Sequence, residues 1–189
     1  MREYSRLVAV TLPDWPVRPQ AESLRQWPTL VDLAGRVQQL PGFEAFVLIG
    51  SLAGGSPDLM SDIDSFALVA NGSFGAAWDA RTTLYECAAF AWDLRTDGEP
   101  EIGKHAWITY DLVLVECVIT SRRGRPKLAD PHVVLFGPAE STDAFVRIPP
   151  IARAELAAYV AKLRDEGHEQ PEVQQRYEEL ARALRAVRP

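Results

Sequence analysis

The stretch FVLIGSLAGGSPDLMSDIDSFALV, residues 46–69, joins two apolar segments through a Gly-Ser pair and a polar loop. Residues 43–49 and 63–70 have the apolar composition of buried strands. Asp62 and Asp64 stand at the mouth of the second strand. Because side chains two positions apart on a strand share a face, we expect the two carboxylates to project together while the residue between them enters the core.

A pair of carboxylates this close repels, and one of them tends to take up a proton. A divalent cation removes the conflict, and oxygen ligands suit Mg²⁺. Upstream, Gly50 lets the backbone approach a ligand, and the hydroxyl of Ser51 with nearby N–H groups can hold a phosphate. Gly54 and Gly55 are expected to keep this loop open. The alternative is a flexible Gly/Ser loop that leads to an Asp-capped strand.

The segment GSLAGGSPDLMSDID, residues 50–64, resembles the signature of the DNA polymerase β-like nucleotidyltransferase superfamily: Gly-Ser, about ten residues, then Asp-x-Asp. It is most similar to small bacterial nucleotidyltransferases of the kanamycin and lincosamide type. The resemblance implies an α+β fold with a mixed β-sheet flanked by helices. It also implies two Mg²⁺ ions and transfer of a nucleoside monophosphate from an NTP, such as ATP, to a hydroxyl. The nucleotide-binding residues it implies are Gly50, Ser51, Gly54, Gly55 and Ser61.

The resemblance requires a third acid on a neighbouring apolar strand. TYDLVLVE, residues 109–116, lies in a predicted strand over 107–120 and offers Asp111 as the third catalytic and metal-binding residue. An aspartate entering an apolar strand needs a partner, which favours this role over that of a solvent-facing strand end. Glu116 is the competitor, on the opposite face and roughly 16 Å along a continuous strand. Only one of the two can complete the site unless a bulge intervenes, and Glu116 is also a candidate general base.

The sequence departs from the family pattern at two places. Relatives commonly carry an arginine in the loop after Gly-Ser, where Leu52, Ala53 and Gly54 stand here, and Ser65 replaces the usual apolar residue. The motifs cover about a third of the chain, from Gly50 to Asp111. Two alternatives therefore stay open. One is a non-catalytic or antitoxin-like nucleotidyltransferase module, and the other is a transferase that acts on a protein side chain or an RNA end.

The composition restricts the partners. The 189 residues carry a net charge of −6, whereas a non-specific nucleic-acid binder is normally basic. An acidic surface favours a small hydroxylated acceptor that is cationic, such as an aminoglycoside, which would make the protein an antibiotic-resistance enzyme. Cys87 and Cys117 are predicted to be buried free thiols in a reducing compartment. With no apolar run long enough for a signal peptide or a membrane span, the expected location is the cytoplasm, and the expected state a monomer or homodimer.

The remaining pattern predicts helices over residues 21–40 and from 74 to the high eighties, and a short strand over 133–136. Two amphipathic helices are expected after Pro149-Pro150. The predicted organisation is a nucleotidyltransferase-like domain over 1–149 and a C-terminal helical appendage over 150–189, or a single domain containing both. We expect the acceptor to bind between the acid face of the sheet and the C-terminal helices.

Overall fold

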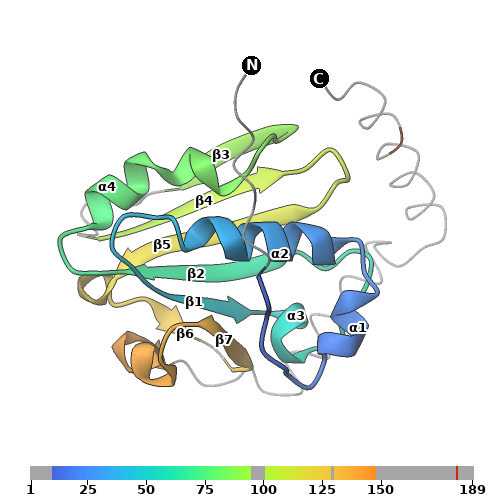
Figure 1. Cartoon of the computed structure of the whole chain (residues 1–189), viewed down its shortest axis with the longest axis horizontal. Coiled ribbons are helices and arrows are strands. Elements are labelled where there is room, and N and C mark those ends of the chain that lie inside the picture. The colour runs from blue at the N-terminus through green and yellow to red at the C-terminus, as the bar shows by residue number, and fades with distance from the viewer. Residues whose placement is uncertain (1–9, 95–100, 129, 148–181, 183–189) are drawn as a thin grey trace, which may run out of the picture.

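The fold is described from a computed structural model, in which residues 10–94, 101–128, 130–147 and 182 are placed. Its centre is a six-stranded mixed sheet (Figure 1). The strands are β1 (Phe43–Ile49), β2 (Ile63–Val69), β3 (Phe90–Leu94), β4 (Ile102–Ile108), β5 (Leu114–Ser121) and β7 (His132–Phe136). Their order across the sheet is β3-β4-β5-β2-β1-β7. The β2–β5 pair is parallel and the other pairs are antiparallel, so the predicted α+β class with a mixed sheet is confirmed.

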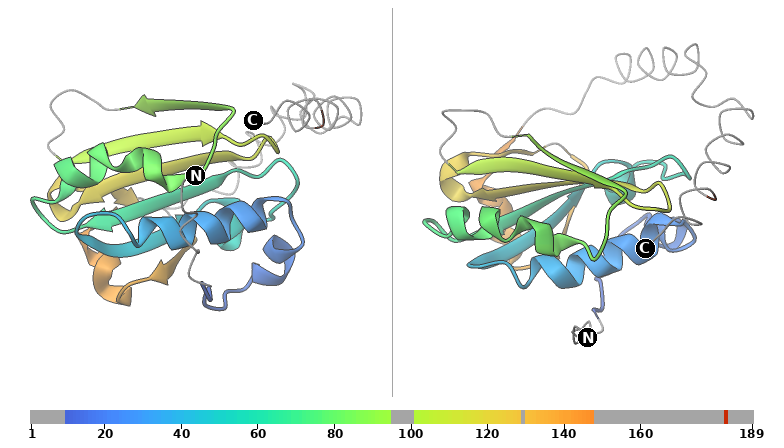
Figure 2. Two further views of the ribbon diagram at one scale, coloured as in Figure 1. Left: turned by 45° about the horizontal axis from the view of Figure 1, so that its top comes forward. Right: turned by 90° about the horizontal axis from the view of Figure 1, so that it is seen from above.

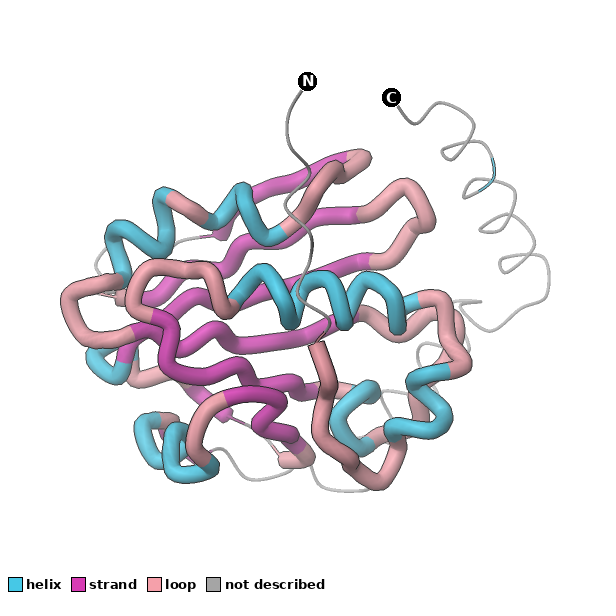
Figure 3. The backbone as a smooth tube through the Cα atoms, viewed as in Figure 1, coloured by secondary structure: helices cyan, strands magenta, loops and turns pink. Residues whose placement is uncertain are grey.

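In the described part of the chain the helices are short, and α2 and α4 cover one face of this sheet (Figures 1, 2 and 3). The helical segments are α1 (Arg18–Glu22), α2 (Gln26–Val37), α3 (Ser51–Gly54) and α4 (Phe74–Asp79), with 3₁₀ turns at Arg81–Leu84, Arg122–Gly124 and Ala139–Ala144. A second, two-stranded sheet pairs β6 (Lys127–Leu128) with β8 (Val146–Arg147). Among the described residues, no helix is long and apolar enough to cross a bilayer.

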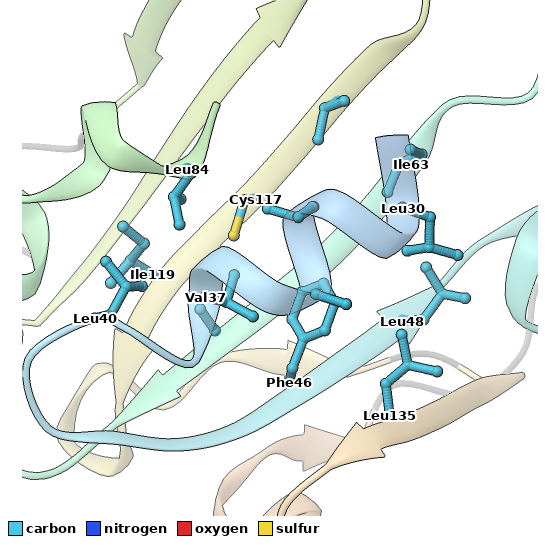
Figure 4. Packing of buried hydrophobic residues seen from close by; sticks show 14 of the residues in the cluster. Leu30, Val37, Leu40, Phe46, Leu48, Ile63, Leu84, Cys117, Ile119 and Leu135 are labelled. Carbon is cyan, nitrogen blue, oxygen red and sulfur yellow. The ribbon is translucent and has the colours of Figure 1, made fainter. Parts of the chain in front are cut away.

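The main core lies between α2 and the sheet. Buried leucine, alanine and valine side chains recur along α2 at helical spacing and pack on apolar side chains of β1, β2 and β5 (Figure 4). The predicted helix over 21–40 is therefore present as two pieces, with a break between α1 and α2. Pro28 lies in the first turn of α2, where its missing N–H removes no helical hydrogen bond.

The single strand predicted over 107–120 is wrong, because the chain folds back within it. β4 ends at Ile108 and β5 begins at Leu114. Between them, the Thr109 amide donates to the Val113 carbonyl at 3.0 Å, and the Leu112 amide donates to the Thr109 carbonyl at 3.0 Å. Leu112 has a φ of 57°, which lets the chain reverse within this short connection. Asp111 therefore stands in a hairpin turn instead of a strand.

Other predicted elements hold in part. The strand over 133–136 is confirmed as β7, whereas the helix from residue 74 ends at Asp79 and continues only as a 3₁₀ turn. Both cysteines are free: Cys117 is buried, and Cys87 is half-buried. The C-terminal helices and the boundary at 149–150 lie outside the described residues.

The face of the sheet opposite α2 holds a second, smaller apolar cluster. Val47 and Phe66 pack there against Leu128 and Phe145, which come from the segment of the two-stranded sheet. The Phe66 and Phe145 rings meet edge to face at 5.1 Å. This cluster covers the part of the face over β1 and β2. The carboxylates of the quoted stretch lie on the same face, toward the mouth of β2.

Candidate functional site

Asp64 and Glu116 lie side by side on the sheet. They are register partners on the parallel strands β2 and β5, so their side chains project from the same face. That face is opposite α2, because Ile63 and Val115, the neighbours of these acids, belong to the main core. Asp62 directly precedes the first residue of β2. The sheet thus pairs Asp64 of the Asp-x-Asp motif with Glu116 of β5, and the charge of Asp62 acts on Asp64 from nearby.

Ser65 helps to fix this register. The side chain of Ser65 is buried, and its hydroxyl donates to the backbone carbonyl of Glu116 at 3.2 Å. The residue that departs from the family pattern therefore ties β2 to β5 next to the acid pair. An apolar side chain at this position could not make that bond.

The carboxyl of Asp64 titrates far from its ordinary range. Burial, and after it the nearby charges of Asp62 and Glu116, raise the pKa of Asp64 to about 7, although the charge of Lys104 lowers it. A hydrogen bond with the Glu116 side chain also stabilises the protonated form. Asp64 therefore keeps its proton to a higher pH than an isolated aspartate does.

Lys104 is the cation of this site. Lys104 lies on β4 two residues before Ala106, which is the register partner of Glu116, so the lysine shares the acid face. Its Nζ lies 2.7 Å from Glu116 Oε2, and the two side chains keep 34% and 24% of their surface exposed. Sequence reasoning missed Lys104, because only the pairing of β4 with β5 places it beside the acids.

Gly50 brings the backbone directly against Asp64. Its φ of 72° and ψ of −157° belong to a region that essentially only glycine adopts. A Cβ on Gly50 would also lie 2.9 Å from Asp64 Oδ2. Gly50 therefore lies directly against the Asp64 carboxylate. Its predicted close approach to a bound ligand stays a prediction. Ser51 follows as the first residue of α3, and its side chain is half-buried.

The rest of the loop is held by packing. A Cβ on Gly54 would lie 2.5 Å from Pro131 Cβ, and one on Gly55 would lie 2.9 Å from Ser51 Cα. These glycines allow close packing instead of keeping the loop open. Trp15 Nε1 donates to the Leu52 carbonyl at 2.8 Å and anchors α3 from the N-terminal segment. The loop glycines thus shape the backbone around the acids.

Ser61 stabilises the turn before Asp62 through hydrogen bonds. Its hydroxyl accepts from the Asp58 amide at 2.9 Å and donates to Asp58 Oδ1 at 3.2 Å. The buried side chain of Gln26 donates to the Ser61 carbonyl at 2.6 Å and to the Asp58 carbonyl at 3.0 Å. These bonds give Ser61 a place in the turn that precedes Asp62. Gln26 was not singled out from the sequence, since a glutamine at the start of a helix gives no such signal.

Asp111 lies away from this acid cluster, at the turn between β4 and β5. It lines a cleft of about 190 Å³ beside the β4–β5 turn, together with residues of α2 and of the segment after the Arg81–Leu84 turn. Trp107, another lining residue, belongs to the main core on the helix side of the sheet. Strand pairing therefore brings Glu116 to Asp64 and does not bring Asp111 there. The cleft residues are Pro28, Thr29, Asp32, Leu84, Tyr85, Glu86, Cys87, Trp107, Thr109, Tyr110 and Asp111.

The acid cluster has the right donor chemistry for a divalent cation, though not a gathered ligand set. Three carboxylates on one face supply the oxygen ligands that Mg²⁺ prefers. Within the described ranges, however, no group of three or more Asp, Glu, His or Cys side chains is arranged to hold a metal ion. Glu116 is held by Lys104 instead. Metal binding here would therefore require a rearrangement of side chains.

Comparison with known proteins adds no relative. No protein-family model matches the sequence, and no curated protein matches it. The argument for function therefore rests on the site.

Proposed function

We propose that the protein is a Mg²⁺-dependent nucleotidyltransferase that moves a nucleoside monophosphate from an NTP to a hydroxyl of a small, cationic acceptor. One observation carries the proposal: Asp64 and Glu116 are adjacent on one sheet face, with Asp62 at the mouth of the same strand and Gly50 against the Asp64 carboxylate. The Gly-Ser and Asp-x-Asp spacing of residues 50–64 supports the same reading. Glu116 takes the place of Asp111 as the third acid.

In this proposal each residue has a defined task. Asp62, Asp64 and Glu116 supply carboxylate oxygens on the side of the sheet opposite α2. Bound Mg²⁺ would supply the charge that neutralises these oxygens and lowers the pKa of the acceptor hydroxyl. Gly50 lets a phosphate approach the backbone, and the Ser51 hydroxyl offers a hydrogen bond at the start of α3. The net charge of −6 favours a cationic acceptor such as an aminoglycoside.

Calorimetry with a non-hydrolysable NTP tests the binding step. We expect the wild type to bind the nucleotide with Mg²⁺ and to lose that binding without it. Asp64→Asn should weaken binding at least tenfold, because it removes one anionic ligand of the site. Asp79→Asn is the matched control, since Asp79 is exposed at the end of α4 on the helix side and undergoes the same change of charge. Equal loss in both variants would reject the site.

Transfer is tested separately with Mg-ATP, a panel of aminoglycosides and neutral polyols, and pyrophosphate release as the readout. Release that depends on a cationic acceptor supports the proposed reaction. Nucleotide binding with no pyrophosphate release from any acceptor would favour the second candidate.

The second candidate is a non-catalytic nucleotidyltransferase-like module. One specific observation favours it: the Lys104 ammonium already neutralises Glu116 at 2.7 Å, as in a site that works without metal. The loop after Gly50 also lacks the arginine common in the resembling family. The two candidates differ in whether a divalent cation binds the acid cluster at all.

A further inference from the structure

We propose that Lys104 is an internal counter-cation of the acid cluster and that it competes with a divalent cation for Glu116. The competition rests on the proposed function, because it requires that Asp62, Asp64 and Glu116 bind a metal. The counter-cation role in the metal-free protein does not depend on the proposed function. The site would then have two states: in one the Lys104 ammonium contacts Glu116, and in the other a metal ion does.

The pairing of β4 with β5 supports the counter-cation role of Lys104. Lys104 Nζ and Glu116 Oε2 are 2.7 Å apart, the distance of a charge-assisted hydrogen bond. Both side chains are about two-thirds or more buried, so this contact is less screened than an ion pair in open solvent. The register partners of Lys104 are Leu94 on β3 and Val118 on β5, both apolar. Glu116 is thus the acid that the structure pairs with this ammonium.

The lysine also acts on Asp64. Glu116, which its ammonium contacts, is the register partner of Asp64, so the positive charge also lies near the Asp64 carboxyl. One ammonium therefore offsets the mutual repulsion of the cluster, which is the electrostatic task of a bound metal ion. Asp62 and Gly50 contribute no positive charge, so Lys104 is the cation that the described part of the site supplies.

Lys104 and a divalent cation would compete for Glu116 because both are positively charged. A divalent cation held by Asp64 and Glu116 would lie within a few ångströms of the ammonium, and like charges at that distance repel. The metal must therefore break the Lys104–Glu116 contact, and the free energy of that contact is subtracted from metal affinity. Removing the ammonium should strengthen metal binding, the opposite of what happens when a ligand-positioning residue is removed.

The test is titration of the full chain with Mn²⁺ alone, without nucleotide, followed by calorimetry. Lys104→Met keeps an unbranched side chain of similar length and removes the charge. We expect its Mn²⁺ dissociation constant to fall roughly tenfold, in keeping with the loss of one nearby like charge. Lys104→Arg should stay at the wild-type value. Lys127→Met is the matched control, because Lys127 is an exposed lysine of β6.

Each outcome decides the inference. Unchanged or weaker Mn²⁺ binding by Lys104→Met, or equal gains in Lys127→Met, would overturn the competition. Urea unfolding at pH 8 then tests the counter-cation role alone: Lys104→Met should be less stable than wild type, since Asp64 and Glu116 repel without the lysine. If no protein binds Mn²⁺ but this loss appears, the proposed function fails and the counter-cation survives. If stability is unchanged as well, the counter-cation role fails too.

Discussion

Asp64 on β2 and Glu116 on β5 are register partners in the one parallel pair of the six-stranded sheet, and their carboxyls share a hydrogen bond. The backbone pairing of β2 with β5 places them there, and the Ser65 hydroxyl adds a hydrogen bond to the Glu116 carbonyl. Two acids in contact on a partly buried surface destabilise the ionised state. When both carboxyls are ionised they repel each other, and a bound cation would reduce that repulsion.

The first prediction concerns Asp64→Asn in the metal-free protein. The pKa of Asp64 in the folded state, about 7, lies above its ordinary value of 3.8. The folded state thus binds more protons than the unfolded state between these values, so this group makes stability fall as pH rises from about 4 to 7. Asparagine does not ionise and can still donate to Glu116. We expect the variant to be more stable than wild type at pH 8, by the order of 2 kcal/mol.

Urea denaturation of both proteins at pH 4, 6 and 8 measures this difference. It should be smallest at pH 4 and should reach a plateau above pH 7. A variant that is less stable than wild type at every pH would show that the Asp64 carboxylate has a structural role instead.

The second prediction separates the two candidates for the third acid. Glu116→Gln should weaken Mg²⁺-dependent nucleotide binding at least tenfold, because Glu116 lies beside Asp64 and provides an anionic oxygen. Asp111→Asn should leave binding within about twofold, because Asp111 lies at the β4–β5 turn beside the cleft on the helix side. Calorimetry with Mg²⁺ and a non-hydrolysable NTP measures both. The reverse order of effects would restore Asp111 as the third ligand.

The third prediction concerns Gly50→Ala. The change forces alanine into a backbone region that only glycine adopts readily and sets its Cβ 2.9 Å from Asp64 Oδ2. We expect a loss of about 2–4 kcal/mol in unfolding free energy, together with weaker nucleotide binding. Gly72→Ala is the matched control: Gly72 has a φ of +85°, and a Cβ there meets nothing within 4 Å.

Because Gly72 shares the positive φ without the contact, its variant isolates the backbone cost, about 1 kcal/mol. Thermal unfolding gives both losses, and calorimetry gives the binding. If the two alanine variants lose equal stability and both keep nucleotide affinity, close approach of Gly50 to the carboxylate has no role in the site.

The central strands and the first two acids could be predicted because their signals are local. Two apolar runs, a Gly-Ser pair and an i, i+2 acid pair are visible within residues 46–69. The third acid is different. Its choice depends on which residue of a distant strand pairs with Asp64, here one 52 positions later, and register between distant parallel strands has no local signal.

The β4–β5 turn explains why Asp111 was preferred over Glu116. The segment over 107–120 is rich in apolar and β-branched residues and holds no glycine or proline, which is typical of a single strand. The reversal uses Tyr110, Asp111 and Leu112, with the positive φ at Leu112 instead of at a glycine or asparagine. Only the pairing of β4 with β5 requires it. Counting five residues along a continuous strand then put Glu116 on the wrong face.

A second buried titratable group gives the opposite pH dependence. His105 on β4 is 3% exposed, its Nδ1 lies 2.6 Å from Asp93 Oδ1, and its ring stacks on Tyr85 at 5.6 Å. Burial lowers the pKa of His105, although Asp93 raises it. The unfolded state therefore binds more protons just below the ordinary pKa of 6.5, so this group makes stability fall as pH falls through that range.

The last prediction follows from these opposing slopes. Between pH 5 and 7, Asp64 makes wild-type stability fall with rising pH, whereas His105 makes it rise, so the two contributions partly cancel. In Asp64→Asn the histidine acts alone, and stability should increase from pH 5 to pH 7. In His105→Gln the aspartate acts alone, and stability should decrease over the same interval, whatever the overall cost of that substitution. Urea unfolding at half-unit steps of pH measures the slopes. Parallel slopes in the two variants would show that neither group titrates in this window, and the protonated Asp64–Glu116 pair would then have to be abandoned.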